Sequence, residues 1–356
     1  MNTKRLELSV DSETGFLRED DATKYFSTFG WFCFIFCLAL FLSQEIIATA
    51  VYYLLPGVYN HYLFSNLLSF VTLYAIALPI ANPILKKLPS VTPLKEKVKP
   101  STFIGGFFVA YLTMYAGNLV SVYLIELIYS ASGNMLENPL EQSVDATPLW
   151  ANGIAESIFL VLSMLSVGFL EELVFRGMIC KRLLALGEGF AVVFSGIFFA
   201  MLHGNLYQLF YAFTLGCLFG LIYVKTGKVI YTIIYHVFIN FIGTVVTTII
   251  NKYVRLEEVV ELLSDENTVN ALMNNDITPI QPYFTDIIII SIYSMVIYGF
   301  IIAGAVLLIT NFKKIKFQSG LLPPPKKSRM SIIFLNGGIA AAIAILVIRM
   351  ILPLIL

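Results

Sequence analysis

The sequence predicts an all-α protein, a polytopic bundle of transmembrane helices. Of its 356 residues, 58% are apolar and 13% are charged, and the mean hydropathy is +0.82. This composition is typical of a chain that crosses a membrane several times. Apolar runs long enough to cross a hydrocarbon core of about 30 Å predict about nine spans. They are 29–55, 62–85, 102–129, 150–180, 189–203, 206–224, 229–250, 285–311 and 331–355.

The fifth predicted span, 189–203, is shorter than the others. As a helix its 15 residues reach about 22 Å, which is less than the thickness of the hydrocarbon core. The turn that follows it, from His203 to Asn205, is therefore expected to lie inside the membrane. Irregular backbone is tolerated at that depth only where it lines protein or a water-filled cavity.

The distribution of basic residues predicts the orientation of the bundle. With a cytoplasmic N-terminus, 20 of the 23 lysines and arginines fall in segments on the cytoplasmic side. Only Lys252, Arg255 and Arg349 fall outside that set. This positive-inside bias predicts an integral protein of the cell membrane with its N-terminus in the cytoplasm and its C-terminus outside. Because the basic residues are distributed by membrane side, the formal net charge of zero says nothing about nucleic-acid partners, and none is expected.

The polar segments divide the chain. Residues 1–27 are acid-rich and are predicted to be a mobile cytoplasmic tail, followed by a two-span extension over 28–87. Residues 251–284 form an acidic outer loop in which the apolar residues follow the spacing of an amphipathic helix at the membrane surface. Residues 285–356 form a C-terminal two-span extension. The segment 100–250, between the first extension and the outer loop, carries the candidate catalytic residues.

Three ionisable side chains interrupt the apolar fourth span. Glu171, Glu172 and Arg176 would each cost at least a few kcal/mol at the centre of a bilayer, so such residues usually face a protein interior and mark function. Glu172 and Arg176 are four residues apart in the favourable order, acid before base, and are predicted to pair along one helical face. Glu171 is left without a local partner, which makes it a candidate general base.

Two of the three histidines lie on later spans at a similar depth. His203 ends the fifth span and follows Phe199 by one helical turn, and His236 precedes Asn240 by one turn in the seventh. At about 1.5 Å per residue, Glu171 and these three polar residues lie about 12 to 22 Å from the cytoplasmic boundary. A lone histidine in such a helix is more often a hydrogen-bonded core residue. Two histidines with an unpaired glutamate and an asparagine indicate a shared site.

These residues form three ordered motifs. They are Glu-Glu-x-x-x-Arg at 171–176, Phe-x-x-x-His at 199–203 and His-x-x-x-Asn at 236–240. In that order on membrane spans, they resemble the motifs of the CAAX protease and bacteriocin-processing (CPBP) family of intramembrane proteases, which includes the type II CAAX prenyl endopeptidases. The resemblance covers roughly residues 100–250, so it implies a catalytic core in spans three to seven. The flanking spans add nothing to it.

The resemblance also implies roles for the residues. Glu171 with His203 would activate a water that attacks a peptide carbonyl, while His236 and Asn240 would hold the developing oxyanion. Glu172, Arg176 and Phe199 would support them. We interpret the reaction as metal-independent, with no cofactor. The alternative is a Zn²⁺ ion held by Glu171, His203 and His236 with an open fourth position.

Three classes of function remain open. The leading prediction is an endopeptidase that acts on a membrane-associated protein or peptide, lipidated or not, in CAAX-type processing or in bacteriocin maturation and immunity. A catalytically inactive scaffold or immunity protein of the same fold is the second class, and loss of function on Glu171→Gln would argue against it. A transporter or proton path is the third. The chain lacks the repeated halves with broken spans that many transporters have.

Overall fold

The computed structural model describes residues 5–61, 63–132 and 154–352, all helical or irregular apart from isolated bridges. The N-terminal part contains α1 (Glu19–Leu54), α2 (Pro56–Tyr59), α3 (Phe64–Phe70), η1 (Val71–Ala77), α4 (Leu78–Leu85) and α5 (Pro100–Ala131). The central part contains α7 (Ile154–Val174), η2 (Phe175–Cys180), α8 (Lys181–Leu183), α9 (Glu188–Leu202), α10 (Leu206–Thr226), α11 (Val229–Asn240), η3 (Phe241–Val246) and α12 (Thr247–Tyr253). The C-terminal part contains α13 (Leu256–Ser264), α14 (Glu266–Met273), η4 (Thr278–Tyr283), α15 (Phe284–Phe312), α16 (Arg329–Phe334) and α17 (Gly337–Ile351).

The all-α membrane-bundle class is confirmed, but the predicted number of spans is not. Seven helical stretches in the described part of the chain are long and apolar enough to cross a membrane. The two remaining predicted spans correspond to α9 and α17, which are only 15 residues each. A helix of that length covers about 22 Å, so neither crosses a 30 Å core by itself.

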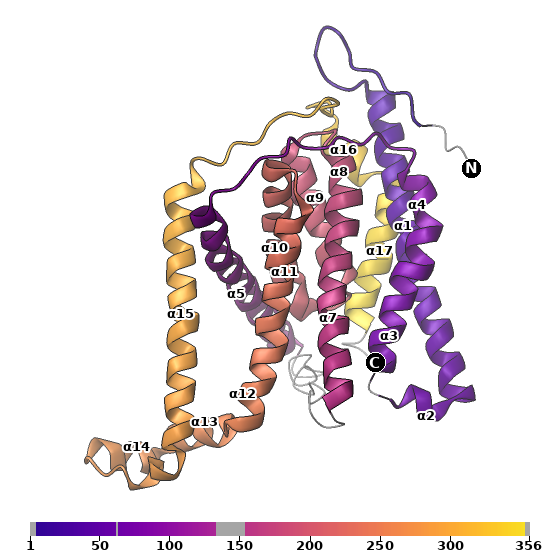
Figure 1. Ribbon diagram of the computed structural model, residues 1–356. Helices are drawn as coiled ribbons and strands as arrows, with labels where there is room; N and C mark the ends of the chain where they lie inside the picture. Colours follow the sequence, from indigo (N-terminus) through magenta and orange to yellow (C-terminus); the bar gives the residue numbers. More distant parts are fainter. Residues whose placement is uncertain (1–4, 62, 133–153, 353–356) are drawn as a thin grey trace.

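The helices run alternately up and down, so the chain's polar connections gather at two opposite ends (Figure 1). The connections 86–99 and 313–328 cross one end beside α8 and α16. The helices α13 and α14 lie at the other end, beyond α12 and α15 (Figure 1). This arrangement is the one expected from the alternation of basic and acidic connections. The orientation in a cell membrane stays a prediction.

The N-terminal segment differs from the predicted mobile tail. Helix α1 begins at Glu19, and the residues before it make hydrogen bonds to both basic connections. The Leu6 amide donates to the Lys87 carbonyl over 2.9 Å, and the Leu17 amide donates to the Pro323 carbonyl over 2.8 Å. Residues 5–18 therefore fold against the end of the bundle.

Small residues let the central helices approach closely. Gly196 of α9 and Gly216 of α10 lie against each other, since a Cβ on Gly216 would stand only 2.9 Å from the Gly196 Cα. Gly30 of α1 and Gly338 of α17 make a similar crossing in which a Cβ on Gly338 would meet the Gly30 backbone. Contacts of this type are the usual packing device between membrane helices, where apolar burial drives no association.

Helix α1 packs on α9 through aromatic rings. Phe32 and Phe36 are fully buried, and their ring centroids lie 6.1 and 5.8 Å from that of Phe198. Phe198 in turn contacts Phe175, which contacts Phe199. A continuous aromatic layer therefore connects the N-terminal extension to the part of α9 that precedes His203.

Candidate active site

The site is built on the C-terminal half of α7. Glu171 and Glu172 occupy its last α-helical turn, and Arg176 lies in the π-helical segment η2 that continues it. Segments of π-helix are rare and occur frequently at functional sites. The predicted pair is present, with Arg176 Nε 3.1 Å from Glu172 Oε2 and both side chains fully buried.

The buried Arg176 guanidinium makes one hydrogen bond and three aromatic contacts besides its ion pair with Glu172. Its Nη2 donates to the carbonyl of Gly216 on α10 over 2.9 Å. The rings of Phe175, Phe199 and Phe219 surround it at 5.9, 5.1 and 5.6 Å, which are cation–π distances. The glycine crossing between α9 and α10 brings the Gly216 carbonyl within reach. A buried charge that is paired in this way holds α7, α9 and α10 together.

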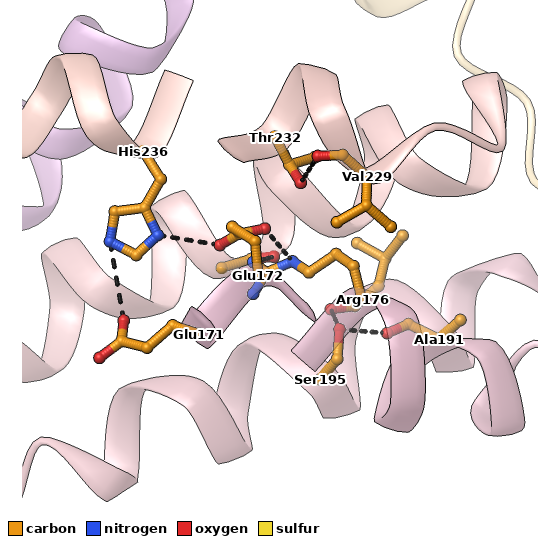
Figure 2. A network of polar contacts seen from close by, with 10 residues as sticks. Glu171, Glu172, Arg176, Ala191, Ser195, Val229, Thr232 and His236 are labelled. Atoms are coloured by element: carbon orange, nitrogen blue, oxygen red, sulfur yellow. Dashed lines mark hydrogen bonds and ion pairs between the residues drawn. The ribbon is translucent and has the colours of Figure 1, made fainter. Parts of the chain in front are cut away.

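His236 lies between the two glutamates, as Figure 2 shows. Its Nδ1 is 3.0 Å from Glu172 Oε1, and its Nε2 is 3.7 Å from Glu171 Oε2. Because Glu172 faces the positive charge of Arg176, it is expected to be ionised and to accept a hydrogen bond from Nδ1–H. The ring is thereby held in one orientation with Nε2 directed at Glu171.

Asn240 lies one turn further along α11 and reaches the same part of α7. Gly168, one turn before Glu171, is buried against both residues. A Cβ at this glycine would stand 3.2 Å from Asn240 Nδ2 and 3.4 Å from His236 Cδ2. The amide and the imidazole therefore border the same side of α7. Asn240 also lines a cavity of about 470 Å³ between α3 and α7.

That cavity lies away from the basic connections. Asn66 and Phe70 of α3 and Phe159 of α7 line it, and these residues belong to the halves of their helices on the side of α2. The positive-inside orientation predicts that this half faces outward. The cavity that reaches Asn240 therefore lies in the half of the bundle away from the basic connections.

His203 is the predicted residue that the structure holds apart from the carboxylates. Its Nδ1 is 2.9 Å from the Phe199 carbonyl. The Phe199 ring lies between the two imidazoles, 4.9 Å from His203 and 5.8 Å from His236 between centroids. In the part of the chain that the structure describes, the His203 ring contacts Phe199 and no carboxylate. A role for His203 beside Glu171 stays a prediction.

The turn after His203 is shaped by its own hydrogen bonds. Gly204 adopts a left-handed φ of +67°, which a residue with a Cβ rarely adopts. Asn205 caps α10 by accepting from the Gln208 amide over 2.9 Å, and its own amide donates to the His203 carbonyl over 3.0 Å. Sequence reasoning placed this turn but missed its neighbour, Arg349 of α17, whose side chain packs against Gly204.

The Zn²⁺ alternative does not fit the arrangement. Among the described residues, no three His, Cys, Asp or Glu side chains are placed to hold a metal ion. His236 Nδ1 is occupied by Glu172, and His203 lies across the Phe199 ring. A site formed by Glu171, His203 and His236 would need these side chains to move together.

One family of known proteins matches the part of the chain that carries the candidate site. A family described as Type II CAAX prenyl endopeptidase Rce1-like matches residues 153–242. The match supports a CAAX protease family assignment for this part of the chain. The matched stretch is 90 of the 356 residues and runs from α7 into η3, so it contains every residue of the candidate site. The comparisons with curated proteins and with solved structures give no match.

The match to this family indicates an endopeptidase, and seven helical stretches in the described part of the chain are long and apolar enough to cross a membrane. The helices outside the match, α1 to α5 and α12 to α17, form the remainder of the bundle.

Proposed function

We propose that this protein is an intramembrane endopeptidase that hydrolyses a peptide bond of a membrane-associated substrate by water activation at Glu171. The observation that carries the proposal is the arrangement of Glu171 opposite His236 Nε2, with Glu172 holding the far side of the ring. A separation of 3.7 Å is too long for a direct hydrogen bond, and one water beside both atoms can bond to each of them.

The proposed chemistry needs no group beyond these side chains. The Glu171 carboxylate takes a proton from the attacking water while the water oxygen adds to the peptide carbonyl. The carbonyl oxygen becomes an oxyanion, which Asn240 stabilises by donation from Nδ2–H, with the His236 ring beside it as the second proposed stabilising group. The Glu171 carboxyl then passes its proton to the leaving nitrogen as the C–N bond breaks. Glu172 remains ionised throughout, because Arg176 pairs with it.

The substrate class follows from the family and from the position of the site. The family description names prenyl endopeptidases, and a site within an apolar bundle suits a peptide whose lipid holds it in the membrane. We therefore propose a lipidated C-terminal peptide, cleaved in CAAX-type processing, as the substrate. The alternative substrate is a bacteriocin precursor.

A peptide cleavage assay tests the proposal. Full-length protein is reconstituted in vesicles with a farnesylated CAAX peptide and, separately, with the same peptide lacking the farnesyl group. We expect release of the three residues after the modified cysteine, detected by mass spectrometry, from the farnesylated peptide only. The control is Glu171→Gln, which should fold and release nothing. Equal release by both proteins would show that Glu171 is not the base, and no release by either would overturn the CAAX assignment.

A further inference from the structure

A second cavity lies at the end of the bundle that carries the basic connections. It has a volume of about 780 Å³ and is enclosed by α5, α10, α11 and α15. Its mouth is formed by Glu96, Lys97, Lys99 and Lys225, and its inner wall includes Val109 and Leu218. A pocket of this volume is large enough for a small-molecule ligand.

The cavity is separate from the candidate active site. Tyr235, which lines it, packs on Phe103 and Phe107 of α5, with its hydroxyl donating to the Phe103 carbonyl over 2.7 Å. The next residue, His236, points instead to Glu172 on α7. The two sites therefore use different faces of α11, and a ligand in this cavity would not touch Glu171.

Polarity changes with depth along the cavity. Helix α5 begins at Pro100, so Val109 lies about 14 Å further in, at 1.5 Å per residue. Helix α10 ends at Thr226, so Leu218 lies about 12 Å in from the same end. Charged side chains occupy the mouth and aliphatic ones the inner wall. This depth corresponds to about one leaflet of a 30 Å hydrocarbon core.

The mouth is fixed in place by backbone contacts. The Glu96 amide donates to the carbonyl of Thr226, the last residue of α10, over 2.9 Å. Gly227, which ends α10 with a φ of +64°, lies against the Leu94 carbonyl. The connection 86–99 is thereby tied to α10 directly before Lys97. The two lysines that follow are held over the cavity.

The charge at the mouth is positive. Lys225 is paired with Glu188, which leaves Glu96 to balance Lys97 and Lys99. Both of these lysines are exposed, and neither has an ion pair with any residue in the described part of the chain. Two ammonium groups over an apolar channel are complementary to a phosphate that carries an acyl chain. Basic pockets between membrane helices on the cytoplasmic side bind anionic headgroups.

We infer that this cavity binds one anionic phospholipid from the leaflet at the end of the basic connections. The phosphate lies between Lys97 and Lys99, and one acyl chain passes Val109 and Leu218 between α5 and α10. The inference does not depend on the proposed peptidase function. If the predicted orientation holds, the lipid belongs to the cytoplasmic leaflet.

Lipid binding by the purified full-length protein tests this inference. Native mass spectrometry is used to compare phosphatidylglycerol with phosphatidylcholine of the same chain length. We expect one tightly held phosphatidylglycerol, and in the variant Lys97→Gln/Lys99→Gln about 30-fold weaker binding, at about fivefold per lysine. Lys86→Gln/Lys87→Gln is the matched control, because these lysines are exposed on the same connection but lie outside the cavity. It should bind phosphatidylglycerol as the wild type does.

A variant of the inner wall tests the acyl chain independently. Leu218→Trp fills the deep part of the cavity and leaves both lysines in place, so it should also weaken phosphatidylglycerol binding. Equal binding of the two lipids by the wild type would overturn the inference, as would wild-type binding by the double-lysine variant. Displacement of phosphatidylglycerol by glycerol phosphate would show an anion site without lipid selectivity. Displacement by a farnesylated peptide would assign the cavity to a peptidase substrate instead.

Discussion

At the scale of single residues, Glu172 and Arg176 form a fully buried ion pair. Substitution of either residue is expected to destabilise the folded protein. The spacing within one helix predicted this pair. It could not predict that Glu172 also holds His236, because local spacing says nothing about which residue of another helix a side chain meets. The depth in the membrane, counted along each helix, predicted that Glu171 and both histidines lie at a similar level. It could not show that the Phe199 ring separates His203 from the carboxylates.

Removing the arginine should destabilise the fold. Arg176→Ala leaves the Glu172 carboxylate uncompensated in a dry interior, which typically costs 3–5 kcal/mol. We expect a lower yield of folded protein and a lower melting temperature in detergent. Glu171→Gln is the control, since Glu171 makes no ion pair with Arg176 and is partly exposed. Equal losses of folded protein in the two variants would contradict the structural role of Arg176.

Loss of the Asn240 amide should lower the catalytic rate without destabilising the fold. Asn240→Leu removes the proposed oxyanion donor, and loss of one such donor typically lowers kcat by about 10²- to 10³-fold. The side chain is only half-buried, so the melting temperature should change little. The measurement is kcat on the farnesylated peptide at saturating substrate. A change in KM with kcat unaltered would argue for substrate binding instead.

At the scale of helices, the short α9 is held by close packing on α10 and by aromatic contacts with α1. Periodicity and length predicted where each helix lies. They could not predict that α9 and α10 cross at Gly196 and Gly216. A glycine in an apolar run can lie at a close helix contact or on an open surface, and the sequence does not distinguish the two. The crossing is what brings the Gly216 carbonyl to Arg176.

Widening that crossing should loosen the site. A Cβ on Gly196 would stand 2.7 Å from Cys217 Sγ and 3.0 Å from the Cys217 backbone nitrogen, so Gly196→Ala forces α9 and α10 apart. Overpacking of this type typically costs about 1–3 kcal/mol. Gly299→Ala on α15 is the control, since no atom lies within 4 Å of its Cβ position. A melting temperature lowered in Gly196→Ala alone is the expected result.

Arg349 connects the two extensions to the turn after His203. Its Nη1 is 3.0 Å from Glu45 Oε1 on α1, and its aliphatic carbons lie against Gly204. Reversing the charges tests the connection. Glu45→Arg and Arg349→Glu should each lower the melting temperature, and the double exchange should restore part of it. If the melting temperature of the double variant falls by the sum of the two single decreases, the ion pair does not stabilise the turn.

At the scale of the whole molecule, composition and basic-residue counting predicted the class of fold and the alternation of its connections. They predicted nine spans, of which seven are long and apolar enough to cross a membrane in the described part of the chain, because apolar character alone does not separate a helix that crosses the membrane from a short one that is sheltered by its neighbours. They also missed that residues 5–18 pack on both basic connections. Contacts between distant loops carry no periodic pattern in sequence.

The arrangement of the two ends can be measured directly. Lys97 and Asp265 lie at opposite ends of the bundle, so single cysteines at these positions should react with a membrane-impermeant maleimide from opposite sides. The background protein carries Cys217→Ser, since the other three native cysteines are buried. Labelling of both positions from one side would contradict the predicted topology.

The central claim is that Glu171 and His236 act together on one water and one carbonyl. It is tested most directly by comparing kcat/KM for Glu171→Gln, His236→Gln and the double variant at matched amounts of folded protein. Residues that act as one unit show strongly non-additive losses. The account predicts that the double variant is no slower than the slower single variant. Losses that multiply in the double variant would show that the two side chains work independently and would contradict it.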